Sequence, residues 1–286
     1  MMLFDQVRQF ASKVSPCYRA LLIASILLLS SGCATTLSYD PSVLRFDVPE
    51  TSGDLFAGSA EVQLGVTGTR VMAERNQGFM GNEIDSSSIA YRTQTPTTGV
   101  RANAGLAKPI DVYVRSMVDT PNVIGAKYQL VGDADKSMPG WRVTFSTEYG
   151  HYQQSEDEGD SQNIEVDYYD YSINVGFRLD PHWLLYVNNF YSRYNIEGSL
   201  GRDVRTKSTI NGMSKGFGQL IGVRYQLPGK NKKTSWLDKP YVTLEIGNSA
   251  LNWLSTNDND GNRLSSNQHL NNVDRAIGLS VGFSWK

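Results

Sequence analysis

Two pairs of serine and histidine residues could in principle form a hydrolytic site. Ser146 lies five residues before His151, and Ser266 lies three residues before His269. A serine becomes a nucleophile when a neighbouring base takes its proton, and histidine is a common base. The matching reaction would be remodelling of a membrane lipid. However, neither pair belongs to a recognisable catalytic motif, and no pattern brings these side chains together, so the sequence predicts that the protein is not an enzyme.

A metal site is not predicted either. The run Asp258-Asn259-Asp260-Gly261 resembles part of a calcium-binding loop, but Thr256 and Asn267 stand where two of its ligands would be needed. A plain polar turn is the simpler interpretation. We therefore expect no metal and no other cofactor.

The amino-terminal part of the chain, 1–32, has the order of an export signal. Basic Arg8, Lys13 and Arg19 come first, an apolar run from Leu21 to Leu29 follows, and small residues come next. The run is shorter than the ~20 residues that a transmembrane helix needs. We therefore leave residues 1–32 out of the fold prediction.

The four residues Ser30-Ser31-Gly32-Cys33 resemble a lipobox, at which bacterial lipoprotein maturation acylates the cysteine and cleaves the chain before it. Ser30 departs from the leucine that is usual there. The resemblance implies lipidation of Cys33, with ordinary cleavage nearby as the alternative. Ala34, in place of an aspartate, implies transport to the outer membrane. Since Cys17 precedes the cleavage point, an acylated Cys33 would leave no thiol for a disulfide or a metal.

The remaining residues, 33–286, are long enough for one large β domain. Residues 33–55 are polar with little periodicity, which predicts a lipid-anchored tether, and residues 56–286 are predicted to be the barrel. The loss of Arg8, Lys13, Arg19 and Asp5 leaves 24 basic and 28 acidic residues. This mild negative charge gives no reason to expect binding to nucleic acid.

Alternation of apolar with polar or small residues predicts strands throughout residues 56–286. The clearest case is the last, where Ile277, Leu279, Val281, Phe283 and Trp285 share one parity. Residues two apart do not lie on one face of a helix, so the pattern indicates a strand. We predict about ten strands (eight or twelve being possible), at residues 60–67, 99–106, 110–118, 123–130, 141–150, 169–179, 183–194, 217–227, 241–248 and 276–285.

The predicted connections alternate in length. Short links at residues 107–109, 133–139 and 180–182 and a medium one at 229–240 alternate with longer polar loops at 68–97, 152–163, 196–214 and 250–273. Only the link at 119–122 is short where a long loop is expected. Outer-membrane barrels have short periplasmic turns and long outer loops. The pattern therefore predicts an all-β, antiparallel, up-and-down transmembrane barrel.

The positions of aromatic residues favour a membrane barrel over a soluble barrel or a β-sandwich. Tryptophans fall at the predicted periplasmic strand ends, and tyrosines and a phenylalanine fall at the outer ends, as in the interface belts of membrane proteins. The predicted belt residues are Trp141, Tyr149, Tyr169, Tyr171, Trp183, Tyr191, Phe217 and Trp285.

Charged residues of the polar parity are predicted to fill the barrel interior. A charge facing lipid at mid-depth costs roughly 2 to 4 kcal/mol, and a buried charge needs a partner. We expect the basic and acidic groups to pair inside the barrel: Glu61, Arg101, Asp111, Arg115, Lys127, Arg142, Glu148, Asp170, Arg178, Arg224 and Glu245.

The last strand, Ile277 to Trp285, resembles the C-terminal signal by which outer-membrane barrel proteins are recognised for assembly, although Lys286 follows the final aromatic residue. The resemblance implies the barrel-assembly machinery as a partner, beside the lipids and lipopolysaccharide of the outer membrane. Open aqueous channels are seen at 16 to 18 strands, so a general porin is not expected. The predicted function is a structural or surface-interaction role. A narrow carrier or sensor of small hydrophobic ligands is the alternative, ahead of a lipid-modifying enzyme.

Overall fold

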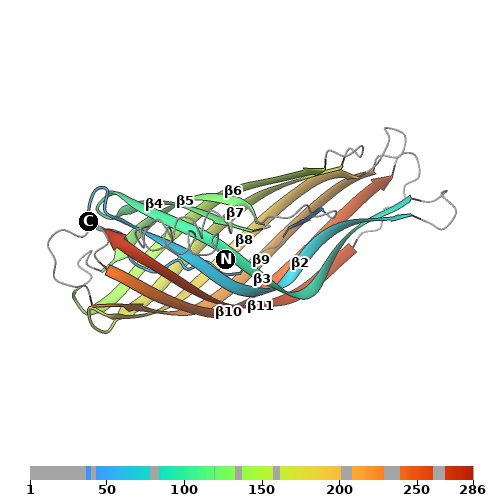
Figure 1. Cartoon of the computed structure of the whole chain (residues 1–286). Helices are drawn as coiled ribbons and strands as arrows, with labels where there is room; N and C mark the ends of the chain where they lie inside the picture. Colours follow the sequence, from blue (N-terminus) through green and yellow to red (C-terminus); the bar gives the residue numbers. More distant parts are fainter. Residues whose placement is uncertain are drawn as a thin grey trace, which may run out of the picture. The chain divides into compact units, whose positions relative to one another are not determined.

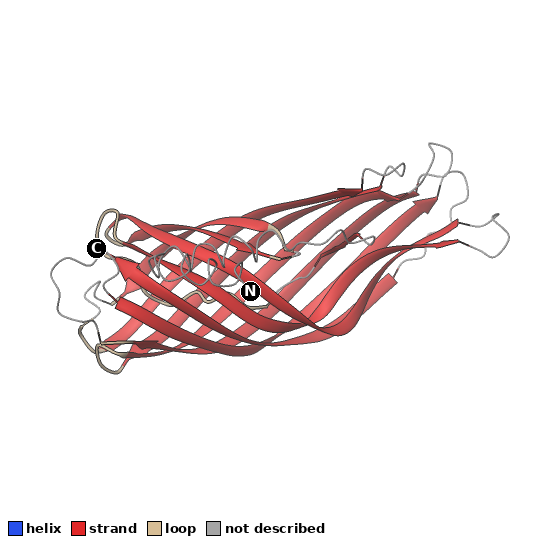
Figure 2. Ribbon diagram, viewed as in Figure 1, coloured by secondary structure: helices blue, strands red, loops and turns tan. Residues whose placement is uncertain are grey.

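The computed structural model describes residues 37–39, 43–77, 84–118, 120–132, 137–156, 162–200, 208–228, 239–259 and 268–285, which belong to one compact unit, Thr36–Lys286. Almost all of them are in β-strands, as Figure 2 shows. The strands are β1 (Leu37–Tyr39), β2 (Gly58–Gln77), β3 (Ile84–Ala107), β4 (Ile110–Met117), β5 (Asn122–Val131), β6 (Gly140–Glu156), β7 (Gln162–Arg178), β8 (Trp183–Leu200), β9 (Ser208–Gln226), β10 (Lys239–Asn259) and β11 (Gln268–Trp285).

Ten antiparallel strands, β2 to β11, form a closed barrel, because each strand pairs with its sequence neighbours and β11 pairs with β2 (Figure 1). This confirms the predicted fold class. The barrel is staggered. Starting at Gly58 in β2 and moving from each residue to its partner on the next strand, through β3 to β10, leads to Val273 in β11. The direct partner of Gly58 in β11, however, is Trp285, the last residue of that strand. Such a stagger tilts strands by roughly 40° from the barrel axis.

The two ends of the barrel differ. At one end, here called the base, β2 begins, β11 ends, and β3 connects to β4 through only Lys108 and Pro109. The C-terminus marks this end in Figure 1. The opposite end, here called the top, carries the connections from β2 to β3, β4 to β5, β6 to β7, β8 to β9 and β10 to β11.

The strands are longer than predicted, and the extra length lies at the top. The predicted loop at residues 68–97 is mostly strand, since β2 continues to Gln77 and β3 starts at Ile84. The predicted loops at 152–163, 196–214 and 250–273 are shortened in the same way. These extensions were missed because they are largely polar and do not continue the outward apolar parity of the strands below them. In β7 the parity is even reversed, since Ile164, Val166 and Tyr168 are buried on the inward face.

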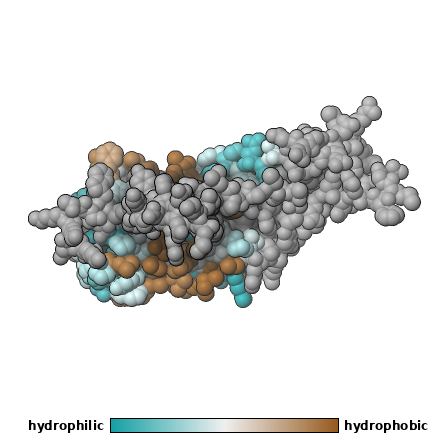
Figure 3. All heavy atoms as spheres, viewed as in Figure 1, coloured by the Kyte–Doolittle hydropathy of each residue, from teal (hydrophilic) through white to brown (hydrophobic). Residues whose placement is uncertain are grey.

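In most strands the apolar parity faces outward and the polar parity faces inward, whereas in β8 the apolar side chains of Leu184, Tyr186 and Phe190 are buried inside the barrel. Ile277 and Val281 are 50% and 53% exposed, whereas Lys127 is only 3% exposed. This arrangement is the reverse of a soluble barrel, whose apolar residues fill the centre. In Figure 3, hydrophobic side chains gather over part of the barrel wall between hydrophilic regions. Among the residues described here, no helix has the length and apolar character required to cross a bilayer.

Candidate functional site: a chain segment inside the barrel

Residues 43–52, here called the lumen segment, run through the interior of the barrel without regular secondary structure. Nearly all of them are buried, and the charged side chains of Arg45 and Asp47 are at most 2% exposed. Their composition had predicted part of a tether outside the barrel. The structure instead places them in the lumen, because their charges and backbone groups match groups on the inner wall.

The upper part of the lumen segment is fixed through Arg45. Its Nη2 donates hydrogen bonds to Asp170 Oδ2 at 3.1 Å and to Ser192 Oγ at 2.9 Å. The guanidinium carbon also lies 4.2 Å from the centre of the Phe190 ring, within the range of a cation–π contact. The backbone N–H groups of Arg45 and Phe46 donate to the carboxylate of Glu245 at 3.2 and 2.8 Å. The lumen segment thus donates hydrogen bonds to two buried carboxylates of the wall, Asp170 and Glu245.

Asp47 is the centre of the lumen segment. Its carboxylate accepts hydrogen bonds from Arg101 Nη2 at 2.7 Å, Ser146 Oγ at 2.6 Å and Asn174 Nδ2 at 2.8 Å, and it forms an ion pair with Lys127. These partners come from β3, β5, β6 and β7. Lys127 also donates to the carbonyl of Val48 at 2.8 Å. One carboxylate is therefore the shared counter-ion of two buried cations and joins four strands.

The lower part of the segment is fixed through Glu50, Thr51 and Ser52. Glu50 receives two parallel hydrogen bonds from the Arg178 guanidinium, at 2.5 and 2.6 Å, a geometry that gives strong and directional pairing. Thr51 donates through its N–H and hydroxyl to Gln129 at 3.1 and 2.7 Å. The backbone N–H of Ser52 donates to both carboxylate oxygens of Asp111, at 3.0 and 2.8 Å.

Glycines on the inner wall make room for the segment. A Cβ at Gly278 would lie 2.6 Å from Phe46 Cζ, and one at Gly176 would lie 2.6 Å from Pro49 Cγ. Both distances are too short for a real contact, so a side chain at either position would displace the segment. The small residues of the inward parity therefore complement the larger side chains of residues 43–52.

Two further ion pairs connect strands without the lumen segment. Arg115 pairs with Glu148 at 2.7 Å, and Arg224 pairs with Glu61 at 3.2 Å. The side chains predicted to point inward are all buried in the structure: Glu61, Arg101, Asp111, Arg115, Lys127, Arg142, Glu148, Asp170, Arg178, Arg224 and Glu245. Arg142 lies 3.8 Å from Glu50. Sequence reasoning missed Arg45, Asp47 and Glu50, although each supplies a charge opposite to that of a wall residue.

The predicted belt aromatics lie on the outward parity of their strands. Trp141, Trp183 and Trp285 stand at the base. Tyr149, Tyr169, Tyr171, Tyr191 and Phe217 lie within their strands rather than at the ends, because the strands continue above them. Tyr149 contacts Tyr169 with ring centres 5.2 Å apart, and Tyr191 contacts Phe217 at 4.7 Å. The upper aromatics thus form neighbouring pairs across adjacent strands.

The serine and histidine residues of the first pair are on opposite faces of β6. Ser146 is buried and donates to Asp47, whereas His151 points outward and lies 3.1 Å from Asp167. Ser266 lies outside the described residues, as do Asp260 and Gly261, and the side chain of His269 is not described either. Within the described part of the chain, no three His, Cys, Asp or Glu side chains are arranged to hold a metal ion.

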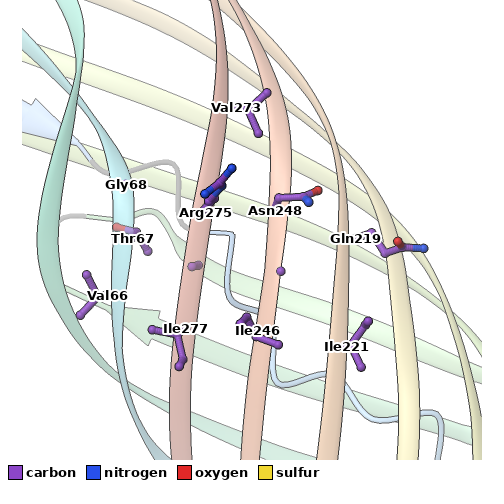
Figure 4. Close-up of a pocket in the computed structure, with 12 residues that line it drawn as sticks. Val66, Thr67, Gly68, Gln219, Ile221, Ile246, Asn248, Val273, Arg275 and Ile277 are labelled. Carbon is purple, nitrogen blue, oxygen red and sulfur yellow. The ribbon is translucent and has the colours of Figure 1, made fainter.

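A groove of about 880 Å³ lies on the outer wall where β11 separates from β2. Its lower row is apolar and consists of Val66, Ile277, Ile246 and Ile221, which are partners across four neighbouring strands. The next row towards the top contains Arg275, Asn248 and Gln219, as Figure 4 shows. The groove therefore joins an apolar surface to one cation and two amides.

Comparisons with solved structures find other barrels of similar architecture. No protein-family model and no curated protein matches the chain. The outer membrane protease OmpT from Escherichia coli is 8% identical, with 82% of this chain and 99% of that chain covered and a TM-score of 0.40. Ail, the attachment invasion locus protein of Yersinia pestis, is 11% identical, with 81% and 100% covered and a TM-score of 0.31. Neisserial surface protein A is 14% identical, with 80% and 96% covered and a TM-score of 0.31. These proteins differ in their named roles, so the likeness indicates no activity for this chain.

Proposed function

We propose that this protein is a lipid-anchored β-barrel of the bacterial outer membrane with a structural or surface-interaction role. The single observation that carries the proposal is the division of its two surfaces. The outer wall is apolar, whereas the interior is filled by paired charges, by two small hydrophobic clusters and by residues 43–52 of the chain itself. Such a barrel can reside in lipid without forming a wide channel.

The proposed orientation follows from the two ends of the barrel. In outer-membrane barrels the long excursions of the chain face the cell surface. Here the strand extensions lengthen the excursions at the top, such as the stretch from Tyr149 to Tyr169, so the top would lie at the cell surface and the base in the periplasm. The last strand, with Phe283 and Trp285 on its outward parity, would then be available to the barrel-assembly machinery from the periplasmic side. The polar strand extensions would stand above the membrane and present the interaction surface.

The interior argues against a role as a general pore. Arg101, Lys127 and Arg178, which would line an open lumen, are instead paired with Asp47 and Glu50. Purified full-length protein in a planar lipid bilayer should therefore give no large, steady conductance. Such a conductance would overturn the proposal.

Class and location can be tested together on protein taken from outer membranes. A folded barrel should migrate faster on a gel when unheated than when boiled. The mass of the mature protein should correspond to residues 33–286 with an acylated Cys33. A protein that is absent from the outer-membrane fraction, or a mature chain without acyl groups, would contradict the membrane part or the lipid part of the proposal, respectively.

A further inference from the structure

The chain before β2 crosses the barrel from top to base. Near the base, the N–H of Phe56 donates to the carbonyl of Gly105, and Trp285 Nε1 donates to the carbonyl of Phe56. Further up, Glu50 meets Arg178, the last residue of β7, and Arg45 meets Asp170, which lies nearer the top of that strand. The contacts thus follow the lumen segment upward as its residue numbers decrease.

The strand β1 continues this path to the upper part of the barrel. Leu37, Ser38 and Tyr39 pair with Ala73, Met72 and Val71 of β2. These partners lie beyond Val66, the last residue of β2 that pairs with β11. They therefore belong to the strand extension at the top, far from the start of β2 at the base.

β11 does not pair with the upper part of β2, and this leaves an edge of β2 to which β1 can bind. From Ile277 and Val66 upward, β11 no longer pairs with β2, and the pairing of β2 with β3 shifts between Thr67 and Thr69. The N–H of Gly68 donates instead to Asp274 Oδ1 at 2.7 Å. Since Val71 to Ala73 pair with β3 on one side, β1 pairs with the edge of β2 that β11 has left. The backbone of β1 also approaches β7 on the other side of the barrel, so β1 lies towards the lumen. We call this place, between the upper parts of β2 and β11, the seam.

We propose that the mature amino terminus leaves the barrel at the seam on the cell-surface side, so that the lipid on Cys33 is anchored in the outer leaflet. This inference rests on the proposed function, because it assumes an outer-membrane barrel and an acylated Cys33. A lipoprotein barrel with an external tether would place this anchor on the periplasmic side. The positions of residues 37–39 and 43–57 favour the opposite side.

The reach of the chain is compatible with this anchor. Cys33 precedes Leu37 by four residues, which span at most about 14 Å when extended. The strand distance from Ala73, the partner of Leu37, down to Val66 at the groove is about 23 Å at ~3.3 Å per residue. An acyl chain as long as one leaflet, about 15 Å, covers the difference. The apolar row with Ile246 and Ile277 offers a surface on which that chain can lie.

The contacts of the lumen segment oppose exit at the base. For the amino terminus to reach the periplasm, the chain would have to turn back within the lumen beside Asp47 and Glu50, whose carboxylates are already bound to Arg101 and Arg178 of the wall. Exit at the base without such a turn would break the pairs with Arg101, Lys127 and Arg178. Surface exit retains every one of these contacts.

The inference can be tested with one epitope placed at two positions in the full-length protein. A short epitope is inserted after Ala34 in one variant, and after Lys232, in the connection between β9 and β10, in the other. Intact cells and cells with an opened outer membrane are then stained with the same antibody. We expect the Ala34 epitope to be stained on intact cells and the Lys232 epitope only after opening.

The outcomes separate the inference from the proposed function. If the protein fractionates with the outer membrane but both epitopes need opening, surface exit is wrong and the proposed function stands. If the Lys232 epitope is stained on intact cells, the orientation in the proposed function is wrong as well. Fractionation and heat-dependent gel mobility are recorded for both variants, so a misfolded variant is recognised.

A pair of cysteines tests the same path without an insertion. Tyr39→Cys combined with Val71→Cys should form a disulfide in the folded protein, because these residues are partners across β1 and β2. The matched control combines Tyr39→Cys with Ser59→Cys near the base of the same strand. A disulfide in the control, or none in the first pair, would show that β1 does not lie at the seam.

Discussion

At the scale of the residue, Asp47 is the most consequential side chain of the interior, because Arg101 and Lys127 both depend on it. Replacing Asp47 with Asn keeps the volume and removes the charge. Leaving buried cations without their anion should destabilise the barrel by about 3 kcal/mol or more. The loss can be measured as a lower free energy of unfolding in urea for protein refolded into lipid vesicles.

The matched control for this substitution is Asp54→Asn. Asp54 lies seven residues further along the same chain, but it is exposed at the base of the barrel. The same chemical change should leave the free energy of unfolding nearly unchanged there. If Asp47→Asn were as mild as Asp54→Asn, the ion pairs of Asp47 would not contribute to stability.

A second residue-scale prediction concerns the close approach of Gly278 and Phe46. Gly278→Ala should cost about 1 to 3 kcal/mol, because its methyl group would overlap the Phe46 ring. Phe46→Ala alone should also destabilise, by leaving a cavity that costs about 3 to 5 kcal/mol. In the double variant the methyl group enters that cavity, so the combined loss should fall short of the sum of the two single losses by about 0.5 kcal/mol or more. Additive losses would mean that the two residues are not in contact.

At the scale of the element, the lumen segment should determine whether ions can pass through the barrel. Replacing residues 43–52 with a Gly/Ser sequence of equal length removes Arg45, Asp47 and Glu50 together. The wall cations Arg101, Lys127 and Arg178 would repel one another and attract water. We expect lower resistance to heat and a small anion-preferring conductance in planar bilayers, in contrast to the silent natural protein.

The replaced segment could also prevent folding, and a second variant addresses that outcome. Thr51→Val with Ser52→Ala removes side-chain hydrogen bonds to Gln129 and Asp111 but keeps the three charged residues. This variant should fold and should give no conductance in planar bilayers. Conductance equal to that of the Gly/Ser variant would show that charge pairing is not what closes the lumen.

The turn between β7 and β8 allows a prediction about pH. Asp180 Oδ1 accepts hydrogen bonds from the N–H groups of His182 and Trp183, at 2.7 and 2.8 Å, and these bonds lower the pKa of the Asp180 carboxyl. A carboxyl with a lowered pKa stabilises the fold above its unfolded-state pKa, and this contribution is lost as the pH falls through its folded-state pKa.

We therefore expect Asp180→Ala to lower the melting temperature slightly at neutral pH and to lose that effect in strong acid. Asp180→Asn keeps an oxygen acceptor, so at neutral pH its melting temperature should lie between those of the natural protein and Asp180→Ala. Its melting temperature should also depend less on pH than that of the natural protein. The measurement is a thermal melt of detergent-solubilised protein at several pH values. An equal effect of Asp180→Ala at all pH values would contradict the role of the charge.

The lower parts of the strands were predictable from the sequence because one face of most of them is apolar. Ile277, Val281 and Phe283 share one parity, and only a strand presents them on one face. The strand extensions do not need an apolar outward face, so their polar residues were predicted to be loops. The lumen segment was missed for a related reason, since its partners are distant in sequence. Glu50 and Arg178 are separated by 128 residues, and no local pattern connects them.

At the scale of the whole molecule, the fold places apolar side chains on the outer face of one sheet and charged side chains on its inner face. The inward charges were identified by parity alone, since each shares a face with its glycine and polar neighbours. Their pairing was not predictable to the same extent. The wall supplies only part of the counter-charge, and Arg45, Asp47 and Glu50 supply the remainder from a segment without alternation.

The proposed position in a bilayer makes a depth-dependent prediction for the outer face of β11. Leu279 and Val273 lie on the same outward parity as Trp285, and Val273 is twice as far from the tryptophan along the strand as Leu279 is. At ~3.3 Å per residue and a tilt of roughly 40°, they stand about 15 and about 30 Å above the tryptophan, near the middle and beyond the edge of a ~25 Å apolar band.

Leu279→Arg should therefore cost about 2 to 4 kcal/mol in lipid vesicles, whereas Val273→Arg should cost about 0 to 1 kcal/mol. Both substitutions place the same side chain on the same face of the same strand, so local effects on strand formation should largely cancel in the comparison. The free energy of unfolding can be followed through tryptophan fluorescence in urea. If water surrounded this wall, an outward arginine would cost the same free energy of unfolding at both positions. Equal costs would thus mean that no lipid surrounds this wall, and a larger cost at Val273 would mean that the apolar band lies higher on the barrel.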